Sequence, residues 1–161
     1  MRVVENKQMT FGEMDISAIK FNPKSRDDVD QVLKGLQFVY CQTDKRETLF
    51  SILEKMVPRN TNKNNGRPGM SLWKIFVLAI LRLNLNWDYD RLLNMANHHE
   101  LIRQMLGHAD NWDRGWYELQ TIKDNFQLLT PEILDELNTF IVDCGHGLVK
   151  KKKKMSKEMF L

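Results

Sequence analysis

The sequence predicts an all-α fold of six or seven helices. Apolar residues recur at three- and four-residue intervals through most of the chain, and no segment shows the strict alternation of apolar and polar residues that a half-buried strand would show. Turn-forming residues separate the periodic segments. The length of 161 residues is that of one domain. We therefore expect a helical domain built around its most apolar segment.

The first 58 residues are expected to form an arm followed by a pair of helices. Residues 1–24 show weak patterning and are interpreted as an extended arm. Ser25 is expected to cap the first helix, because a serine hydroxyl can accept a free N–H group at a helix start. The second helix is expected to begin near Asp44, with Glu47 completing a capping box.

Residues 59–70 are expected to form a basic linker. Asparagine, glycine and proline are frequent here and favour turns over regular structure. Arg59, Lys63 and Arg67 are its charged residues, and it contains no acid. A solvated loop and an arm that follows a phosphate backbone are both compatible with this composition.

The segment after the linker, Leu72–Leu83, is the most apolar in the chain. Its sequence is apolar on nearly every side, with only Lys74 and Arg82 as charged residues, and Ser71 precedes it as a cap. A central buried helix is predicted. The two cations lie eight positions apart, about 12 Å along the helix axis, so both can reach the same surface.

A short turn, Asn84–Trp87, leads to a predicted helix over Tyr89–Asn97 with Asp88 as its cap. This spacing fits a helix-turn-helix module. Ordinary packing of helices gives the same spacing, so the pattern alone does not decide between the two interpretations. The predicted helix-turn-helix-like region extends over residues 71–149.

Three more helices are expected in that region. A short helix contains Leu101 and stops at Gly107, a residue suited to helix ends. Another covers about Glu118–Leu129. The last begins at Thr130, which is followed by proline and glutamate, a strong helix-start pattern.

Charge is unevenly distributed. The formal net charge is +3, but residues 83–149 contain four basic and eleven acidic residues. The tail, residues 150–161, contains six lysines and one glutamate. Residues 59–82 have five basic residues and no acid, so they are the only basic stretch of the body. Nucleic-acid binding would have to depend on such local patches, because attraction to phosphate needs clustered lysine and arginine.

The sequence argues against several classes of protein. The longest uncharged apolar run, Ile75–Leu81, has seven residues and is too short to span a membrane. The two cysteines, Cys41 and Cys144, are far apart and fit a reducing compartment. We therefore expect a cytoplasmic protein with no membrane contact.

No catalytic or metal site is expected. His98, His99 and His108 lack a cysteine at ligand spacing, and adjacent histidines on a helix point about 100° apart. Cys144 and His146 flank one glycine without an evident third partner. No cofactor is predicted.

An ordered set of segments resembles a known family. The apolar helix follows Gly66–Arg67–Pro68–Gly69, the turn into the next helix is formed by residues 84–91, and a later segment covers 118–134. Residues 9–28 add a fourth segment. On these residues the chain resembles the N-terminal domain of DDE transposases, in particular the ISNCY-type insertion-sequence transposases, up to about residue 150.

The resemblance implies a function. In such transposases the N-terminal helical region recognises the terminal inverted repeats of the element, and a following RNase H-like domain cuts and joins DNA with a metal-binding Asp-Asp-Glu triad. Residues 150–161 do not look like the continuation into that domain. The resemblance therefore implies a DNA-binding fragment that is not itself an enzyme, with Mg²⁺ needed only by a full-length relative. The lysine run fits a solvated tail or helix end, a source of non-specific affinity for phosphate, or a frameshift.

The expected partners are double-stranded DNA with terminal inverted repeats, and a second copy of the chain or a full-length transposase. Because Leu72–Leu83 is too apolar to contact bases, Glu118–Leu129 is expected to do so, with Tyr89–Asn97 as the second choice. The expected DNA-binding residues are Arg67, Lys74, Arg82, Arg91, Gln120, Thr121, Lys123 and Asn125. The alternative function is a helical oligomerisation or protein-interaction module.

Overall fold

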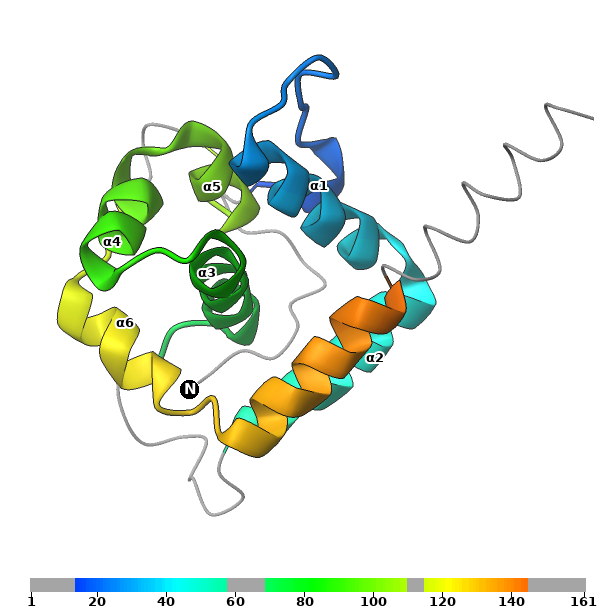
Figure 1. Ribbon diagram of the computed structural model, residues 1–161, viewed down its shortest axis with the longest axis vertical. Coiled ribbons are helices and arrows are strands. Elements are labelled where there is room, and N and C mark those ends of the chain that lie inside the picture. Colours follow the sequence, from blue (N-terminus) through cyan, green and yellow to red (C-terminus); the bar gives the residue numbers. More distant parts are fainter. Residues whose placement is uncertain (1–13, 58–68, 110–114, 145–161) are drawn as a thin grey trace, which may run out of the picture.

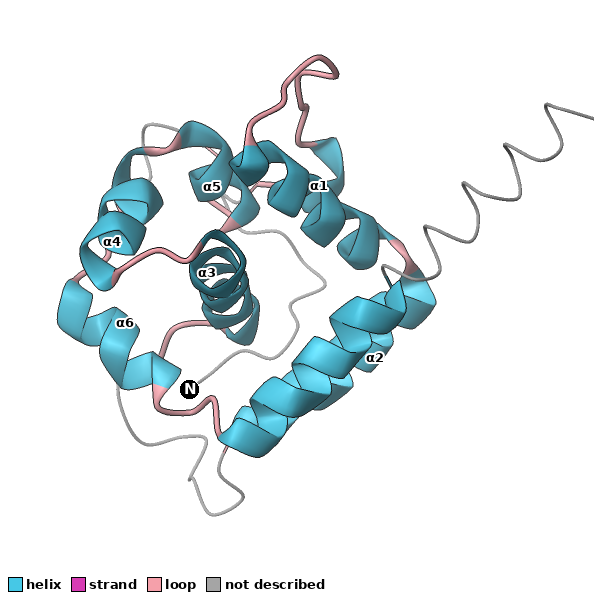
Figure 2. Cartoon of the chain, in the orientation of Figure 1, coloured by secondary structure: helices cyan, strands magenta, loops and turns pink. Residues whose placement is uncertain are grey.

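The computed structural model describes residues 14–57, 69–109 and 115–144, and these residues form helices and connecting loops with no β-strand (Figure 2). The predicted all-α fold is confirmed. The last helix, over residues 131–144, reaches the end of a described range and is here called the C-terminal helix. The other elements are η1 (Ile16–Ala18), α1 (Asp28–Cys41), α2 (Thr43–Leu53), η2 (Glu54–Met56), α3 (Leu72–Leu85), α4 (Tyr89–His98), α5 (Glu100–Met105) and α6 (Leu119–Phe126).

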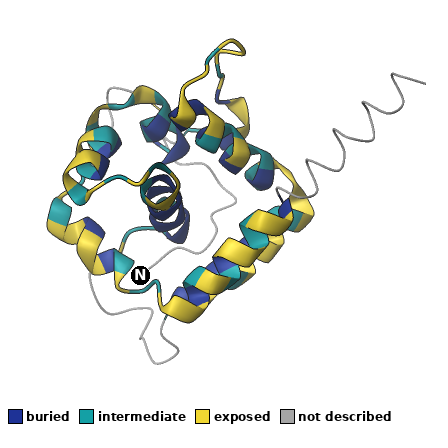
Figure 3. Cartoon of the chain, in the orientation of Figure 1, coloured by how far each residue is buried: buried dark blue, intermediate teal, exposed yellow. Residues whose placement is uncertain are grey.

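Helix α3 lies at the centre of the molecule, with α1 and α2 on one side and α4 and α6 on the other (Figure 1). The Ser71 hydroxyl accepts the Lys74 N–H at 3.3 Å, so the predicted cap is confirmed. Figure 3 shows α3 as buried over most of its length. The helix continues to Leu85, two residues beyond the predicted end. Its buried side chains are Leu72, Trp73, Ile75, Phe76, Val77, Leu78, Ala79, Ile80 and Leu81.

Trp73 joins α3 to three neighbouring helices. Its ring centroid lies 5.0 Å from that of Tyr40 in α1 and 6.4 Å from that of Phe50 in α2. Its indole N–H donates a 2.8 Å hydrogen bond to the carbonyl of Met105 in α5. Carbonyl groups in the last turn of a helix have no partner within the helix, so this bond satisfies one of them.

The expected cap of α1 is wrong. The helix begins at Asp28, and the carboxylate of Asp27 accepts the Val29 N–H at 3.0 Å. The Ser25 hydroxyl instead accepts the Asp27 N–H at 3.3 Å, two residues earlier. Two residues with capping side chains lie close together here, and the second of them starts the helix.

The expected capping box at the start of α2 is also wrong. Gln42 ends α1 by donating its N–H to the Phe38 carbonyl, and it also occupies the position before α2. The chain therefore re-enters a helix after one residue, at Thr43. Asp44 and Glu47 lie inside the helix, where they do not form the reciprocal pair of hydrogen bonds that defines a capping box.

The expectation of an extended arm is wrong for residues 14–24. Ile16 and Ile19 are buried against α1. The side-chain amide of Gln37 in α1 donates to both of their carbonyl groups at 2.9 Å. Residues 1–13 of the expected arm lie outside the described part of the chain.

The C-terminal helix packs beside α2 (Figure 1). The Thr130 hydroxyl accepts the Ile133 N–H at 3.3 Å, as the start pattern predicts. Ile133, Leu137 and Cys144 are buried along one side of the helix. A 2.6 Å ion pair joins Glu136 to Lys55 in η2.

Buried side chains from both sides of the linker form one hydrophobic cluster. The cluster includes residues of α1 and α2 before the linker and residues of α3, α4, α5 and α6 after it. In the described ranges, no helix combines the length and the apolar character needed to cross a lipid bilayer.

Candidate nucleic-acid interface

The turn between α3 and α4 determines how these helices meet. Asn86 ends α3 in the left-handed conformation, with φ of 52°, which asparagine tolerates better than most residues. The Trp87 N–H then donates to the Arg82 carbonyl at 3.1 Å. The Asp88 carboxylate accepts the Arg91 N–H at 2.7 Å, so the predicted cap of α4 is confirmed.

This geometry brings side chains from three helices together at Tyr89, the first residue of α4. The guanidinium carbon of Arg82 in α3 lies 4.2 Å from the centroid of the Tyr89 ring. The ammonium nitrogen of Lys123 in α6 lies 5.2 Å from the same centroid. Phe126 packs against Tyr89 with a centroid distance of 6.1 Å. Both cations are close enough to the ring for a cation–π interaction.

Arg91 and Trp87 form a second cation–aromatic pair. The guanidinium carbon of Arg91 lies 5.6 Å from the Trp87 ring centroid. Both pairs are at the amino-terminal end of α4. We refer to these five residues, Arg82, Trp87, Tyr89, Arg91 and Lys123, as the cation–aromatic cluster.

The three cations of the cluster have no carboxylate partner among the residues described. The one ion pair in those residues joins Lys55 to Glu136, and no carboxylate lies within 4.0 Å of Arg82, Arg91 or Lys123. The Nε of Arg82 is buried without a hydrogen-bond partner. Arg82 contacts a ring, and none of its N–H groups donates a hydrogen bond within the described residues.

Acidic residues also lie close to the cluster. Asp88 and Asp90 flank Tyr89, and both are exposed. The Asp88 carboxylate is engaged as a cap, whereas Asp90 has no such bond among the described contacts. Asp124 in α6 accepts a 2.7 Å hydrogen bond from the Gln120 amide. These carboxylates reduce the positive potential of the surface.

The structure brings together two of the residues expected to bind DNA, Arg82 and Lys123, on the ring of Tyr89, and it places a third, Arg91, on the ring of Trp87 at the same end of α4. Lys74 lies in the first turn of α3, two turns before Arg82, and is half-buried. Arg67 lies outside the described residues.

The expected base-contacting surface of α6 is partly wrong. Gln120 and Thr121 are exposed, as predicted, but Asn125 is buried. The Asn125 amide donates to the Thr121 carbonyl at 2.7 Å within the same helix. Asn125 is three residues from the buried Ile122, so both face inward. Asn125 is therefore excluded from direct base contact in this conformation.

Sequence reasoning missed Tyr89, the ring that Arg82 and Lys123 share. Arg82 and Tyr89 are on opposite sides of a turn, and Lys123 is 34 positions beyond Tyr89 in the sequence. Acidic residues also outnumber basic residues within 83–149, so the charge pattern gives no indication of a cationic surface there. The one available signal was the placement of two aromatic residues, Trp87 and Tyr89, at the start of a helix.

The three histidines considered as metal ligands have other contacts. His98 packs edge-on against Trp116, and the His99 Nδ1 accepts the Ile102 N–H at 3.3 Å as the cap of α5. The His108 Nε2 lies 2.7 Å from the Tyr117 hydroxyl oxygen. Across residues 14–57, 69–109 and 115–144, no three His, Cys, Asp or Glu side chains form a group that could hold a metal ion.

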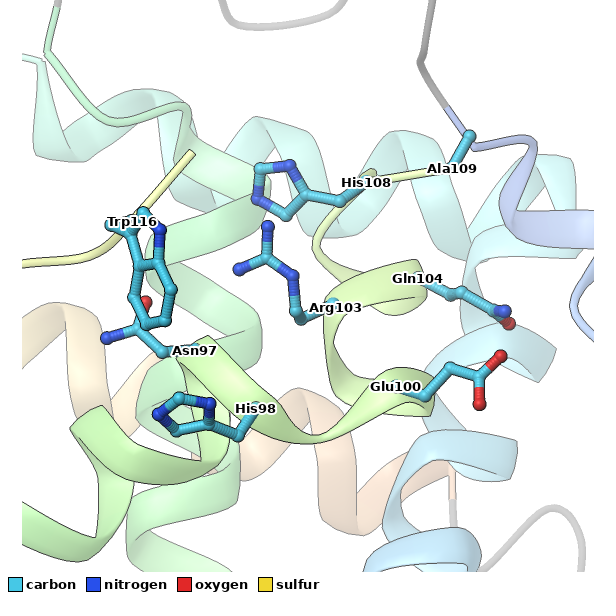
Figure 4. Close-up of a pocket in the computed structure, with 8 residues that line it drawn as sticks. All are labelled: Asn97, His98, Glu100, Arg103, Gln104, His108, Ala109 and Trp116. Carbon is cyan, nitrogen blue, oxygen red and sulfur yellow. The ribbon is translucent and has the colours of Figure 1, made fainter. Parts of the chain in front are cut away.

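An open cavity of about 540 Å³ lies where α4 meets α5 (Figure 4). The Arg103 guanidinium points into it and donates to the carbonyls of Ala96 and Gly115 at 3.2 Å. The residues that line it are Asn97, His98, Glu100, Arg103, Gln104, His108, Ala109 and Trp116.

Comparison of the chain with family models, curated proteins and solved structures found no match. The resemblance to transposases therefore remains a prediction from the sequence.

Proposed function

We propose that this chain binds double-stranded DNA through the cation–aromatic cluster, with the terminal inverted repeats of a transposable element as its target. The observation that supports this proposal is that three cations on adjoining helices, Arg82, Arg91 and Lys123, have no carboxylate partner among the described residues. The choice of target comes from the sequence resemblance.

Unpaired cations are unexpected in this part of the chain. Residues 83–149 contain eleven acids and four bases, so carboxylates for ion pairs are abundant. Arg82 and Lys123 nevertheless pack on an aromatic ring, which limits their side-chain motion without neutralising their charge. A phosphate that binds there meets cations that are already partly ordered, so less side-chain entropy is lost on binding.

Helix α6 supplies the polar side chains for base contacts in this proposal. Gln120 and Thr121 are exposed on the helix that also holds Lys123. One N–H of the Gln120 amide is engaged by Asp124, which leaves the amide oxygen and the other N–H for a base edge. Asp124 would thus orient Gln120 at the cost of adding a negative charge near the phosphates.

The proposal is tested by the salt dependence of DNA binding. Three phosphate contacts give a slope of log affinity against log salt of about −2.7. Affinity should then fall about 40-fold between roughly 50 and 200 mM salt. Lys123→Gln should reduce the slope to about −1.8 and the fall to about 12-fold. Fluorescence anisotropy with a labelled inverted-repeat duplex measures both values.

Lys24→Gln is the matched control, because Lys24 is an exposed lysine in the loop before α1, away from the cluster. It should leave the slope unchanged. A second control removes residues 150–161, which contain six lysines. If that removal abolishes binding while Lys123→Gln and Arg82→Gln bind normally, the tail is responsible and the cluster is not the DNA site.

Specificity is tested by comparing the repeat with scrambled DNA. Gln120→Ala should reduce the preference for the repeat by roughly 1 kcal/mol, at the low end for a lost base contact because one N–H is already engaged. Arg82→Gln should weaken binding to both DNAs equally. Self-association that is insensitive to salt, without any DNA binding, would instead favour the oligomerisation module.

A further inference from the structure

The exposed face of α6 carries a polar pair whose hydrogen bond limits what the pair can bind. Helix α6 lies at the edge of the molecule beside α4 (Figure 1). Gln120 and Asp124 are both exposed and four residues apart, so they lie on the same face of the helix. The Nε2 of Gln120 donates to the Oδ1 of Asp124 at 2.7 Å.

This hydrogen bond determines which way the Gln120 amide faces. A carboxylate only accepts hydrogen bonds, so the amide nitrogen, and not the amide oxygen, must face Asp124. One of the two amide N–H groups is therefore engaged. The amide oxygen and the other N–H remain, which gives Gln120 one acceptor and one donor for a further partner.

One donor together with one acceptor matches adenine better than any other base in the major groove of DNA. Adenine presents the N7 acceptor next to the amino group on C6, which is a donor. Guanine presents two acceptors, N7 and O6, and would need two donors where Gln120 has one left. Cytosine presents only a donor and thymine only an acceptor and a methyl group, so each leaves one group of the amide without a partner.

The pair also lies near the cations that are proposed to hold phosphate. Lys123 is three residues beyond Gln120, about 4.5 Å along the axis of α6. Its ammonium group contacts the Tyr89 ring, which Arg82 contacts from α3. Phosphate contacts fix the register of a protein on a duplex, and base contacts then supply the specificity. A phosphate bound at these cations would place the DNA backbone about one helical turn from the Gln120 amide.

We propose that Gln120 binds one adenine in the major groove, and that Asp124 is a positioning residue that favours adenine over guanine by engaging one N–H of the amide. This inference rests on the proposed DNA binding and adds the identity of the base. The charge of Asp124 opposes the phosphates, so it lowers the affinity for every duplex while it raises the discrimination between bases.

Replacement of the adenines in a labelled inverted-repeat duplex by 7-deazaadenine, one at a time, tests the contact with the base. This analogue still pairs with thymine but lacks the N7 acceptor. At one position it should weaken binding of the unaltered chain about fivefold in anisotropy titrations, as expected for a lost base contact. It should have no effect at that position on Gln120→Ala. The control is Gln31→Ala, an exposed glutamine of α1, which should retain the fivefold effect.

The role of Asp124 is tested by exchanging that adenine–thymine pair for guanine–cytosine. Asp124→Ala should bind both duplexes more tightly, because a negative charge is removed, but should lose most of the preference for adenine. Asp124→Glu should retain the preference, because its carboxylate can still accept from Gln120. The ratio of the two affinities separates positioning from charge, since charge acts equally on both duplexes.

The inference is overturned if no adenine position is sensitive, or if Gln120→Ala shows the same sensitivity as the unaltered chain. It is also overturned if the sensitive base is a guanine in a parallel scan with 7-deazaguanine. Failure of the proposed function has a different signature, because Lys123→Gln would then leave the salt slope unchanged. A normal salt slope without dependence on any adenine contradicts this inference alone, and absence of duplex binding contradicts both.

Discussion

Replacement of Trp73 by phenylalanine changes the side chain only modestly in size but should cause a large loss of stability. Trp73 is buried, contacts rings in α1 and α2, and donates to the Met105 carbonyl of α5. Phenylalanine keeps an aromatic ring at this position but has no N–H group. The Met105 carbonyl then loses the hydrogen bond that satisfies it at the end of α5.

The expected loss is the sum of two effects. A buried carbonyl left without its donor costs about 1–3 kcal/mol. The smaller ring also leaves unfilled volume and weakens the contacts with Tyr40 and Phe50, which adds about 1 kcal/mol. Trp73→Phe should therefore lower the free energy of unfolding by about 2–4 kcal/mol. This is a large fraction of the roughly 5–15 kcal/mol typical of a folded domain.

Urea unfolding followed by circular dichroism measures this loss. The slope of free energy against urea should remain the same, because the same surface is exposed on unfolding. Trp116→Phe is the matched control, since Trp116 is 63% exposed and its replacement should change stability by less than about 0.5 kcal/mol. The reasoning is refuted if the two variants lose equal stability, or if Trp73→Phe loses less than about 1 kcal/mol.

Three further changes test local features. His99→Ala should cost about 1 kcal/mol of stability in urea unfolding through loss of the α5 cap, while His99→Asn should retain most of it. Burial raises the pKa of the Cys144 thiol above its ordinary value of 9.0, so the unfolded chain loses this proton first. The free energy of unfolding should therefore fall as pH rises past about 9, and it should fall less steeply for Cys144→Ala than for the unaltered chain. Equal slopes of stability against pH for the two proteins would contradict this. Asp90→Asn should strengthen duplex binding about twofold in anisotropy titrations at low salt, and unchanged affinity would place phosphate elsewhere.

The start of a helix could be predicted where only one nearby residue could cap it. Ser71, Asp88 and Thr130 each cap the helix that their sequence context indicates, because a capping bond involves atoms only two or three residues apart. The prediction failed at Ser25, where Asp27 competes for the same role. It failed at Asp44 because the preceding helix ends only one residue before the next begins.

The candidate site was predictable only in part. The charge of Arg82, Arg91 and Lys123 is evident in the sequence, but the meeting of Arg82 and Lys123 on the Tyr89 ring depends on the angle at which α3, α4 and α6 meet. Asn125 was misplaced although its spacing from Ile122 already indicated an inward face. The cavity beside Trp116 could not be predicted, since no pattern in the sequence indicates which tryptophan remains in water.

The central position of α3 has a consequence for how the chain opens. Helices that precede the linker and helices that follow it both contact α3, so neither group can separate without exposing its apolar side chains to water. Opening of either group therefore also exposes apolar side chains of α3. The amide hydrogens of α3 should exchange with solvent only when the entire chain unfolds, and proteases should find no stable half-molecule to release.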